Sequence, residues 1–170
     1  MMRTLLIGGT SAIGEQVARC LAVAKGTLCL TARDIRCLDA IAADLKVRGA
    51  VQVEIERLDM TDAAALEGLV SRAVESLGGL DTVIVAAGLL PDQNEVHRDS
   101  QRLRETMEIN ATSAMVILNE AAALFEQQGH GRIVAIGSVA GDRGRATNYA
   151  YGAAKGALEV FMSGLRQRLH

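Results

Sequence analysis

Short apolar runs rich in β-branched residues alternate five times with longer, alanine-rich segments, and this alternation constrains the fold more than any other feature of the chain. The longer segments carry apolar residues at helical spacing, whereas the short runs are almost continuously apolar, as strands buried on both faces are. Repeated strand–helix units favour a parallel sheet with right-handed crossovers and helices on both faces. The expected strands are Thr4–Gly8, Thr27–Thr31, Val51–Arg57, Thr82–Ala86 and Arg132–Ile136.

This pattern predicts an α/β fold of the Rossmann type, with a doubly wound parallel sheet of five strands in a three-layer α/β/α arrangement. No linker or internal repeat interrupts the chain, so we expect residues 1–170 to form a single domain. Such a length buries roughly 70% of the surface of the unfolded chain. With two Phe, two Tyr and no Trp, the core must be aliphatic.

Composition argues against several classes of function. The net charge of −2 and the lack of a basic, aromatic stripe make nucleic-acid binding improbable. Cys20, Cys29 and Cys37 have neither a paired spacing nor a His cluster nearby, so we expect no metal site and no disulfide framework, and buried or half-buried thiols. No stretch reaches the roughly 18 apolar residues of a membrane span. These features predict a cytoplasmic protein.

The first predicted strand ends in a glycine-rich turn, GGTSAIG at positions 8–14, and a helical pattern follows at 15–24. Such a turn allows the backbone to approach a pyrophosphate, whose charge then lies at the unpaired N–H groups of the helix N-terminus. A tight strand-to-helix connection with no ligand is the competing interpretation. Because the turn opens the first strand–helix unit, nucleotide binding is the better one.

Tyr151 and Lys155 form a YxxxK pair in the last helical segment. Residues four apart lie one helical turn apart on nearly the same face. An ammonium group at that distance stabilises a phenolate, which suits a tyrosine to exchange a proton at neutral pH. Tyr149 lacks such a partner and is expected to line a pocket wall. Ser138, at the end of the fifth predicted strand, directs a hydroxyl towards the ligand crevice of such a sheet.

Together these motifs resemble the short-chain dehydrogenase/reductase family of the classical type. The resemblance implies that Tyr151 exchanges the proton with the substrate and that Ser138 orients the substrate oxygen. It also implies that Lys155 tunes the reactivity of Tyr151 and binds the nicotinamide ribose. Asn110 matches the family's fourth catalytic residue, which helps to hold a water molecule in a proton relay. A local backbone contact is the other interpretation of an asparagine within a helix.

The same resemblance implies a dinucleotide cofactor. When the cofactor-binding positions of the family are matched to this sequence, the residues expected to contact the cofactor are Gly8, Thr10, Ser11, Ile13, Gly14, Arg33, Asp59, Met60, Ala87, Gly88, Tyr151 and Lys155. Ala32 stands where NAD-binding members carry an acid and Arg33 follows it, so NADP(H) is favoured and NAD(H) remains possible. Asp34 is better explained as a helix N-cap, and so is Thr61 or Asp62. Ala12 replaces a family glycine, which would strain the turn if its φ were positive.

These residues predict an oxidoreductase that transfers hydride between the cofactor and a carbonyl or alcohol. The run GDRGRATNYAYGAAK, from 141 to 155, is similar to the branch of decaprenyl-phosphoryl 2-keto-erythro-pentose reductases, which suggests a keto-sugar substrate. Two alternatives stay open, a non-catalytic dinucleotide-binding or assembly module and a relative of nucleotide-sugar epimerases. The family also implies a homo-dimer or homo-tetramer.

Full-length members of the family continue past the tyrosine helix with further strands and a Pro-Gly turn, so this chain looks short at its C-terminal end. We therefore expect an open sheet edge and an uncovered apolar helix face, formed by Leu158, Phe161, Leu165 and Leu169.

Overall fold

The computed structural model describes residues 2–169 and contains one parallel sheet with strand order β3-β2-β1-β4-β5. The chain winds outward from β1 to β3, returns to the other side of β1, and continues to β5, so β1 and β4 flank the switch point. The strands are β1 (Arg3–Ile7), β2 (Thr27–Ala32), β3 (Gln52–Arg57), β4 (Thr82–Val85) and β5 (Arg132–Ala135). The predicted doubly wound, three-layer fold is confirmed, with strand limits that differ by a single residue at one or both ends.

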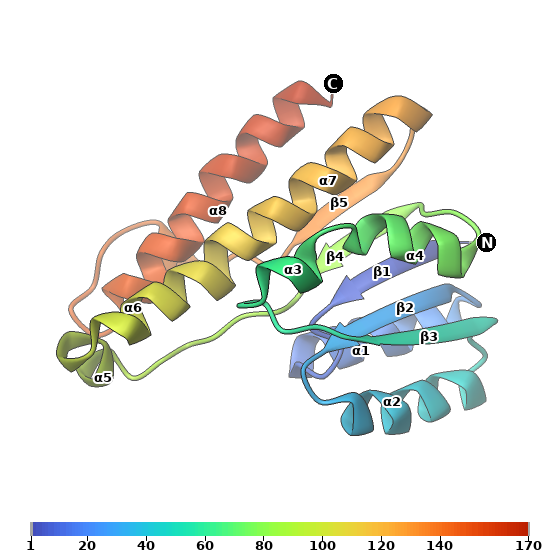
Figure 1. Ribbon diagram of the computed structural model, residues 1–170, viewed down its shortest axis with the longest axis horizontal. Coiled ribbons are helices and arrows are strands. Elements are labelled where there is room, and N and C mark those ends of the chain that lie inside the picture. The colour runs from blue at the N-terminus through green and yellow to red at the C-terminus, as the bar shows by residue number, and fades with distance from the viewer. Residues whose placement is uncertain (1, 170) are drawn as a thin grey trace.

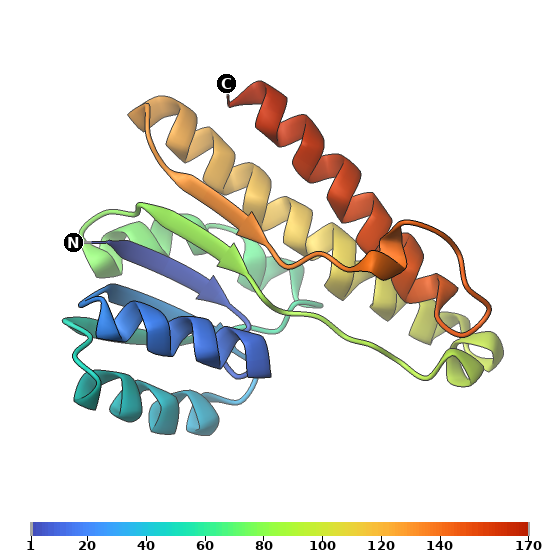
Figure 2. The same ribbon diagram turned by 180° about the vertical axis from the view of Figure 1, so that it is seen from behind.

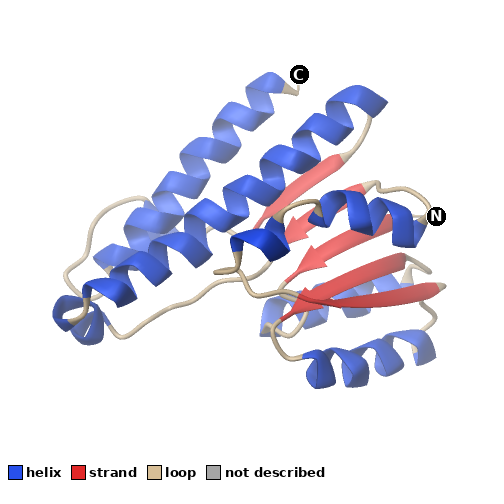
Figure 3. Ribbon diagram, viewed as in Figure 1, coloured by secondary structure: helices blue, strands red, loops and turns tan. Residues whose placement is uncertain are grey.

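Helices cover both faces of the sheet (Figure 1). The helices are α1 (Ala12–Val23), α2 (Ile35–Val47), α3 (Ala63–Leu66), α4 (Leu69–Leu77), α5 (Gln93–Arg98), α6 (Ser100–Met107), α7 (Ser113–Gln128) and α8 (Tyr149–Arg168). One π-helical turn, η1 (Glu108–Thr112), joins α6 to α7, and one 3-10 turn, η2 (Val139–Gly141), follows β5. Figure 3 separates these helices from the strands by colour.

Two aliphatic clusters fill the layers between sheet and helices. Leu6, on one face of β1, packs with the buried residues of α1 and α2. Leu5 and Ile7 point to the other face and pack against α4, α7 and α8. The alternation along β1 therefore serves both layers at once, which is why its sequence is continuously apolar.

Among the described residues, β5 forms one edge of the sheet. Figure 2 shows α1 and α2 over one half of the rear face, while no described helix lies over β4 and β5 on that side. Val134 of β5 is 40% exposed there. The expectation of an uncovered helix face was wrong, because Leu158 and Leu165 are buried and Phe161 packs against the same cluster. Only Leu169 of that set is exposed.

One smaller expectation, the burial of the cysteines, also needs correction. Cys29 is buried, but Cys20 and Cys37 are exposed rather than half-buried, because they lie on the solvent side of α1 and α2. Asp34 caps α2 by accepting hydrogen bonds from the backbone N–H of Arg36 and Cys37, and Asp62 caps α3, both as predicted. Among the described residues, no helix combines the length and apolar character needed to cross a bilayer.

Candidate active site

The glycine turn has the geometry that a backbone cradle needs. Gly8 has a φ of +87°, a left-handed conformation that disfavours side chains, and a Cβ placed on it would lie 2.5 Å from the backbone nitrogen of Ala87. Ser11 caps α1, because its Oγ accepts from the N–H of Gly14 at 3.0 Å and donates to the Gly8 carbonyl at 2.8 Å. Ala12 is exposed and its φ is not positive, so the backbone strain that a positive φ would cause at this position is absent.

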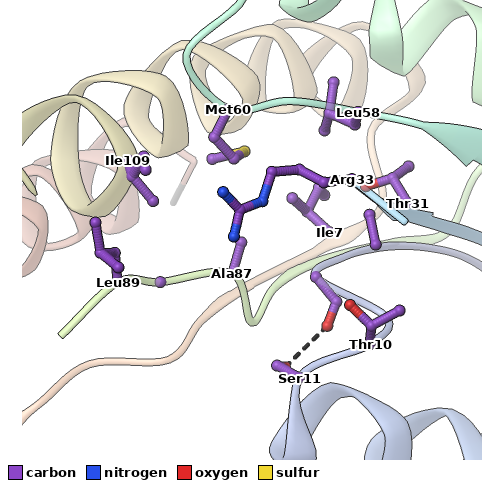
Figure 4. Close-up of a pocket in the computed structure, with 13 residues that line it drawn as sticks. Ile7, Thr10, Ser11, Thr31, Arg33, Leu58, Met60, Ala87, Leu89 and Ile109 are labelled. Carbon is purple, nitrogen blue, oxygen red and sulfur yellow. Dashed lines mark hydrogen bonds between the residues drawn. The ribbon is translucent and has the colours of Figure 1, made fainter. Parts of the chain in front are cut away.

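A pocket of about 220 Å³ opens beside this turn, at the carboxyl ends of β1, β2 and β4. Figure 4 shows the side chains that surround it. Of the predicted cofactor contacts, Gly8, Thr10, Ser11, Arg33, Met60, Ala87 and Gly88 line it. The remaining walls are Ile7, Thr31, Ala32, Leu58, Leu89 and Ile109. Parallel strands bring these distant segments together because their carboxyl ends share one edge of the sheet.

Arg33 reaches across the mouth of this pocket towards Ala87 and Met60 (Figure 4). It is exposed and forms none of the ion pairs found among residues 2–169. Thr31 also lines the pocket, and its side-chain hydroxyl is fully buried with no hydrogen-bond partner among the described residues. A guanidinium group that forms no ion pair at the wall of a pocket suits an anionic ligand.

Five predicted cofactor contacts lie outside the pocket lining, namely Tyr151 and Lys155 of α8, and also Ile13, Gly14 and Asp59. Ile13 is 53% exposed on α1, and Gly14 is buried under the turn, where a Cβ would collide with the Gly8 carbonyl. Asp59 accepts hydrogen bonds from the N–H and hydroxyl of Thr61. Those bonds, and more weakly the charge of Arg33, hold the pKa of Asp59 below its usual value. Asp59 thus remains a carboxylate at neutral pH, beside the pocket rather than in its lining.

Asn110 lies in the π-helical turn η1 rather than in a regular helix, and its amide group is fully engaged. The Nδ2 atom donates to the carbonyls of Leu89 and Thr106, at 2.8 and 2.9 Å, and Oδ1 accepts from the N–H of Leu89 at 2.9 Å. The contact with Thr106 is the kind of local backbone contact that was the other interpretation of Asn110 from the sequence. The two bonds to Leu89 brace the loop that follows β4.

Lys155 is almost entirely buried on α8, and burial lowers the pKa of its ammonium. Its Nζ donates to the carbonyl of Ile136 at 2.9 Å and lies 5.8 Å from the centroid of the Tyr151 ring. Ile136 is the one hydrogen-bond partner of Nζ within residues 2–169, so two of its three N–H donors stay available. The predicted helical spacing therefore brings this charge beside the ring of Tyr151.

Ser138 begins the turn η2, where its Oγ accepts from the N–H of Ala140 at 3.2 Å. That bond leaves the hydroxyl hydrogen available to donate. The turn packs directly on the backbone of α8, since a Cβ on Gly152 would collide with the Ala140 carbonyl and one on Gly156 would lie 2.9 Å from the Gly141 carbonyl. Two small residues on α8 thus let Ser138 and the helix of Tyr151 approach closely.

Gly88 connects these groups to the pocket. It lines the pocket, and a Cβ placed on it would lie 3.1 Å from Oδ1 of Asn110 and 3.8 Å from Nζ of Lys155. Neither Tyr151 nor Lys155 lines the pocket itself. Tyr149 does not form a pocket wall either, because its exposed ring stacks on His97 with a centroid separation of 5.5 Å.

Sequence reasoning missed the apolar walls formed by Ile7, Leu89 and Ile109, and also Gln93, whose side chain contacts the start of α8. Ile7 ends β1 and so could have been found from the strand pattern alone. Leu89, Ile109 and Gln93 carried no signal, because apolar and amide side chains are common and their neighbours here are remote in sequence.

Comparisons with known proteins agree with this geometry. The sequence model of the short chain dehydrogenase family matches residues 3–170. An uncharacterised oxidoreductase of Mycobacterium tuberculosis is 37% identical over 166 residues, which is 98% of this chain and 66% of that protein. One from Streptomyces coelicolor is 34% identical over 173 residues, with the same shares. This chain therefore spans just under two thirds of the length of these curated relatives.

Solved structures show the same fold. An alcohol dehydrogenase of Comamonas testosteroni, described as specific for bulky-bulky ketones, is 28% identical with a TM-score of 0.90. The match covers 99% of this chain and 68% of that one. A short-chain type dehydrogenase/reductase from Mycobacterium ulcerans is 26% identical with a TM-score of 0.89, over 99% and 62% of the two chains.

Proposed function

Because the chain belongs to the short-chain dehydrogenase family, we propose that it forms the cofactor-binding and catalytic part of an oxidoreductase that interconverts a carbonyl and an alcohol with NADP(H). One observation carries the proposal. A buried lysine ammonium lies beside the ring of Tyr151, at the end of the sheet where the glycine turn and its pocket open.

The residues present fit a dinucleotide. The left-handed Gly8 keeps side-chain atoms away from the cradle, and the capped N-terminus of α1 offers unpaired N–H groups to a pyrophosphate. Thr31 has a buried, unpartnered hydroxyl, and Arg33 has no carboxylate partner of its own in the part of the chain described. When bound, the cofactor supplies the hydride.

The chain's own residues supply placement and the proton. In the reductive direction the Tyr151 hydroxyl donates its proton to the carbonyl oxygen, and the Lys155 ammonium stabilises the resulting phenolate. Ser138 donates a hydrogen bond to the same oxygen. Its Oγ accepts from the N–H of Ala140, so its hydroxyl hydrogen is available for this bond. Asn110 keeps the loop after β4 in place, so that Gly88 remains between the pocket and Lys155.

Replacing Arg33 with serine tests the cofactor preference. We expect the Kd for NADPH to rise roughly 10- to 100-fold, because a guanidinium–phosphate contact is a charge-assisted hydrogen bond of about 1.5–3 kcal/mol. The Kd for NADH should change less than about two-fold, since that cofactor lacks the extra phosphate. Titration of each cofactor by its fluorescence measures both constants.

Arg36→Ser is the matched control, since Arg36 is exposed on α2 and does not line the pocket. Equal losses of NADPH and NADH affinity in Arg33→Ser would show that Arg33 does not read the phosphate.

We propose a polar ketone, such as a keto-sugar, as the substrate. The loop between Ser138 and Tyr151 carries two exposed arginines, Arg143 and Arg145, and neither forms an ion pair among the described residues. Guanidinium groups bind hydroxyls and phosphates well. Consumption of NADPH is measured over a panel of keto-sugars and of bulky apolar ketones, the latter because of the Comamonas relative. Exclusive turnover of the apolar ketones would rule out the polar substrate.

We also propose that the chain self-associates through α7 and α8. Each helix exposes a valine, with Val116 47% and Val160 74% exposed. Val160→Glu is expected to shift the molecular mass in analytical ultracentrifugation to that of a monomer, because a buried charge without a partner opposes association. Val47→Glu is the matched control on α2, where Val47 is 88% exposed. A parent protein that sediments as a monomer would contradict the proposal.

A further inference from the structure

The helix that carries Tyr151 starts without a side-chain cap of its own. Asn148 occupies the N-cap position of α8, yet its side chain accepts no hydrogen bond from the first turn. Its Oδ1 atom is instead buried without a partner. The first N–H groups of a helix have no partner within the helix, so they need an acceptor from elsewhere when they are buried. Ala150 is 1% exposed, so its N–H is such a group.

Gln93 supplies the acceptor from a different element. It is the first residue of α5, it is only 6% exposed, and its Oε1 accepts from the N–H of Ala150 at 3.2 Å. Figure 1 shows α5 beside the start of α8. A second contact supports the first, since His97, further along α5, stacks on Tyr149. Both contacts are made with Tyr149 and Ala150, the two residues that directly precede Tyr151 in the first turn of α8.

Only the oxygen of the Gln93 side-chain amide is hydrogen-bonded. Its Nε2 atom is buried with no hydrogen-bond partner. Burial of an unpaired amide donor is unfavourable, and a leucine or methionine would fill the same space without that cost. The bond from Oε1 to Ala150 is therefore the interaction that favours glutamine at this position.

We propose that Gln93 is a positioning residue, which caps α8 in place of Asn148 and fixes the turn from which Tyr151 projects. The inference rests on the proposed reductase function. Gln93 also connects the two halves of the site, because α5 follows directly on the loop after β4, which contains Gly88. Asn110 braces one part of that loop and Gln93 fastens its far end to α8.

Three variants of the full chain separate the cap from general packing. Gln93→Leu removes the acceptor, whereas Gln93→Glu keeps an oxygen where Oε1 lies, and burial at this position favours the neutral, protonated form of the new carboxyl group. Asn94→Leu is the matched control, because Asn94 is the exposed next residue of α5 and its side chain makes no hydrogen bond in the described part of the chain. Hydrogen exchange of the Ala150 amide reports on the cap itself. We expect exchange to rise about five-fold in Gln93→Leu and to stay within about two-fold of the parent in the other two.

Tyrosine signals give a readout that does not need turnover. The chain has two tyrosines, so fluorotyrosine labelling gives two fluorine NMR signals, which Tyr149→Phe assigns. The Tyr151 signal should shift or broaden in Gln93→Leu and remain in place in Gln93→Glu and Asn94→Leu. With an accepted ketone, kcat should fall about ten-fold in Gln93→Leu at an unchanged KM for NADPH, and Gln93→Glu should restore most of it.

Each outcome decides one question. Unchanged exchange at Ala150, or an unmoved Tyr151 signal in Gln93→Leu, overturns the positioning role. A shifted signal with unaltered kcat leaves Gln93 as a structural cap and also overturns it. If the parent reduces no ketone at all, the proposed reductase function fails, and the exchange and NMR results still decide whether Gln93 holds the turn of Tyr151.

Discussion

Tyr151→Phe is expected to lower the rate of ketone reduction by about 100- to 10,000-fold, because general acid catalysis by a placed side chain contributes a factor of that size. The substitution removes one oxygen and leaves the ring beside the ammonium of Lys155. The Kd for NADPH should therefore change little. NADPH consumption at saturating cofactor measures the rate, and fluorescence titration measures the affinity.

Tyr149→Phe is a closely matched control. The same atom is removed two residues earlier, from an exposed ring that stacks on His97, so the expected change in rate is less than about two-fold. Turnover that survives in Tyr151→Phe would remove Tyr151 from the mechanism. Tight NADPH binding by a parent that turns over no ketone would favour a non-catalytic dinucleotide-binding module.

Gly8→Ala is expected to lower the free energy of unfolding by about 2–4 kcal/mol and to abolish measurable NADPH binding. The φ of +87° costs an alanine about 1–2 kcal/mol. Its Cβ would also lie 2.5 Å from the backbone nitrogen of Ala87, which cannot move without displacing the loop after β4. Urea unfolding measures the stability, and fluorescence titration measures the binding.

Gly164→Ala is the comparison, because it makes the same change within α8 where the φ is not positive and the added Cβ would meet no described atom within 4 Å beyond its own turn of helix. Alanine there should raise stability by up to about 1 kcal/mol through helix propensity. A Gly8→Ala protein that unfolds at the parent's urea concentration and binds NADPH normally would show that the turn tolerates a side chain.

The sequence was sufficient for features that depend on local pattern. The strand–helix alternation predicted the sheet, and short polar residues before helices predicted the caps at Asp34 and Asp62. The glycine turn was recognisable because Gly8 follows a buried strand directly. These signals lie within a few residues of the structure that they specify.

Features that depend on remote neighbours were missed or misjudged. An apolar stripe through Leu158 and Leu165 is evident in the sequence, but whether another element covers it depends on how α8 packs in the fold. The π-helical turn at Asn110 has no sequence signature of its own. The role of Gln93 arises because a loop of the fourth strand–helix unit returns to the start of α8.

The amide of Asn110 has one further consequence. By accepting from the N–H and donating to the C=O of Leu89, it pairs with that residue as the peptide group of an adjoining strand would, four residues past the end of β4. A carboxylate at this position offers only acceptors, and would face the Leu89 carbonyl with like partial charge. Chemical conversion of this single amide to an acid would thus loosen the segment running from Gly88 towards α5, without disturbing any strand.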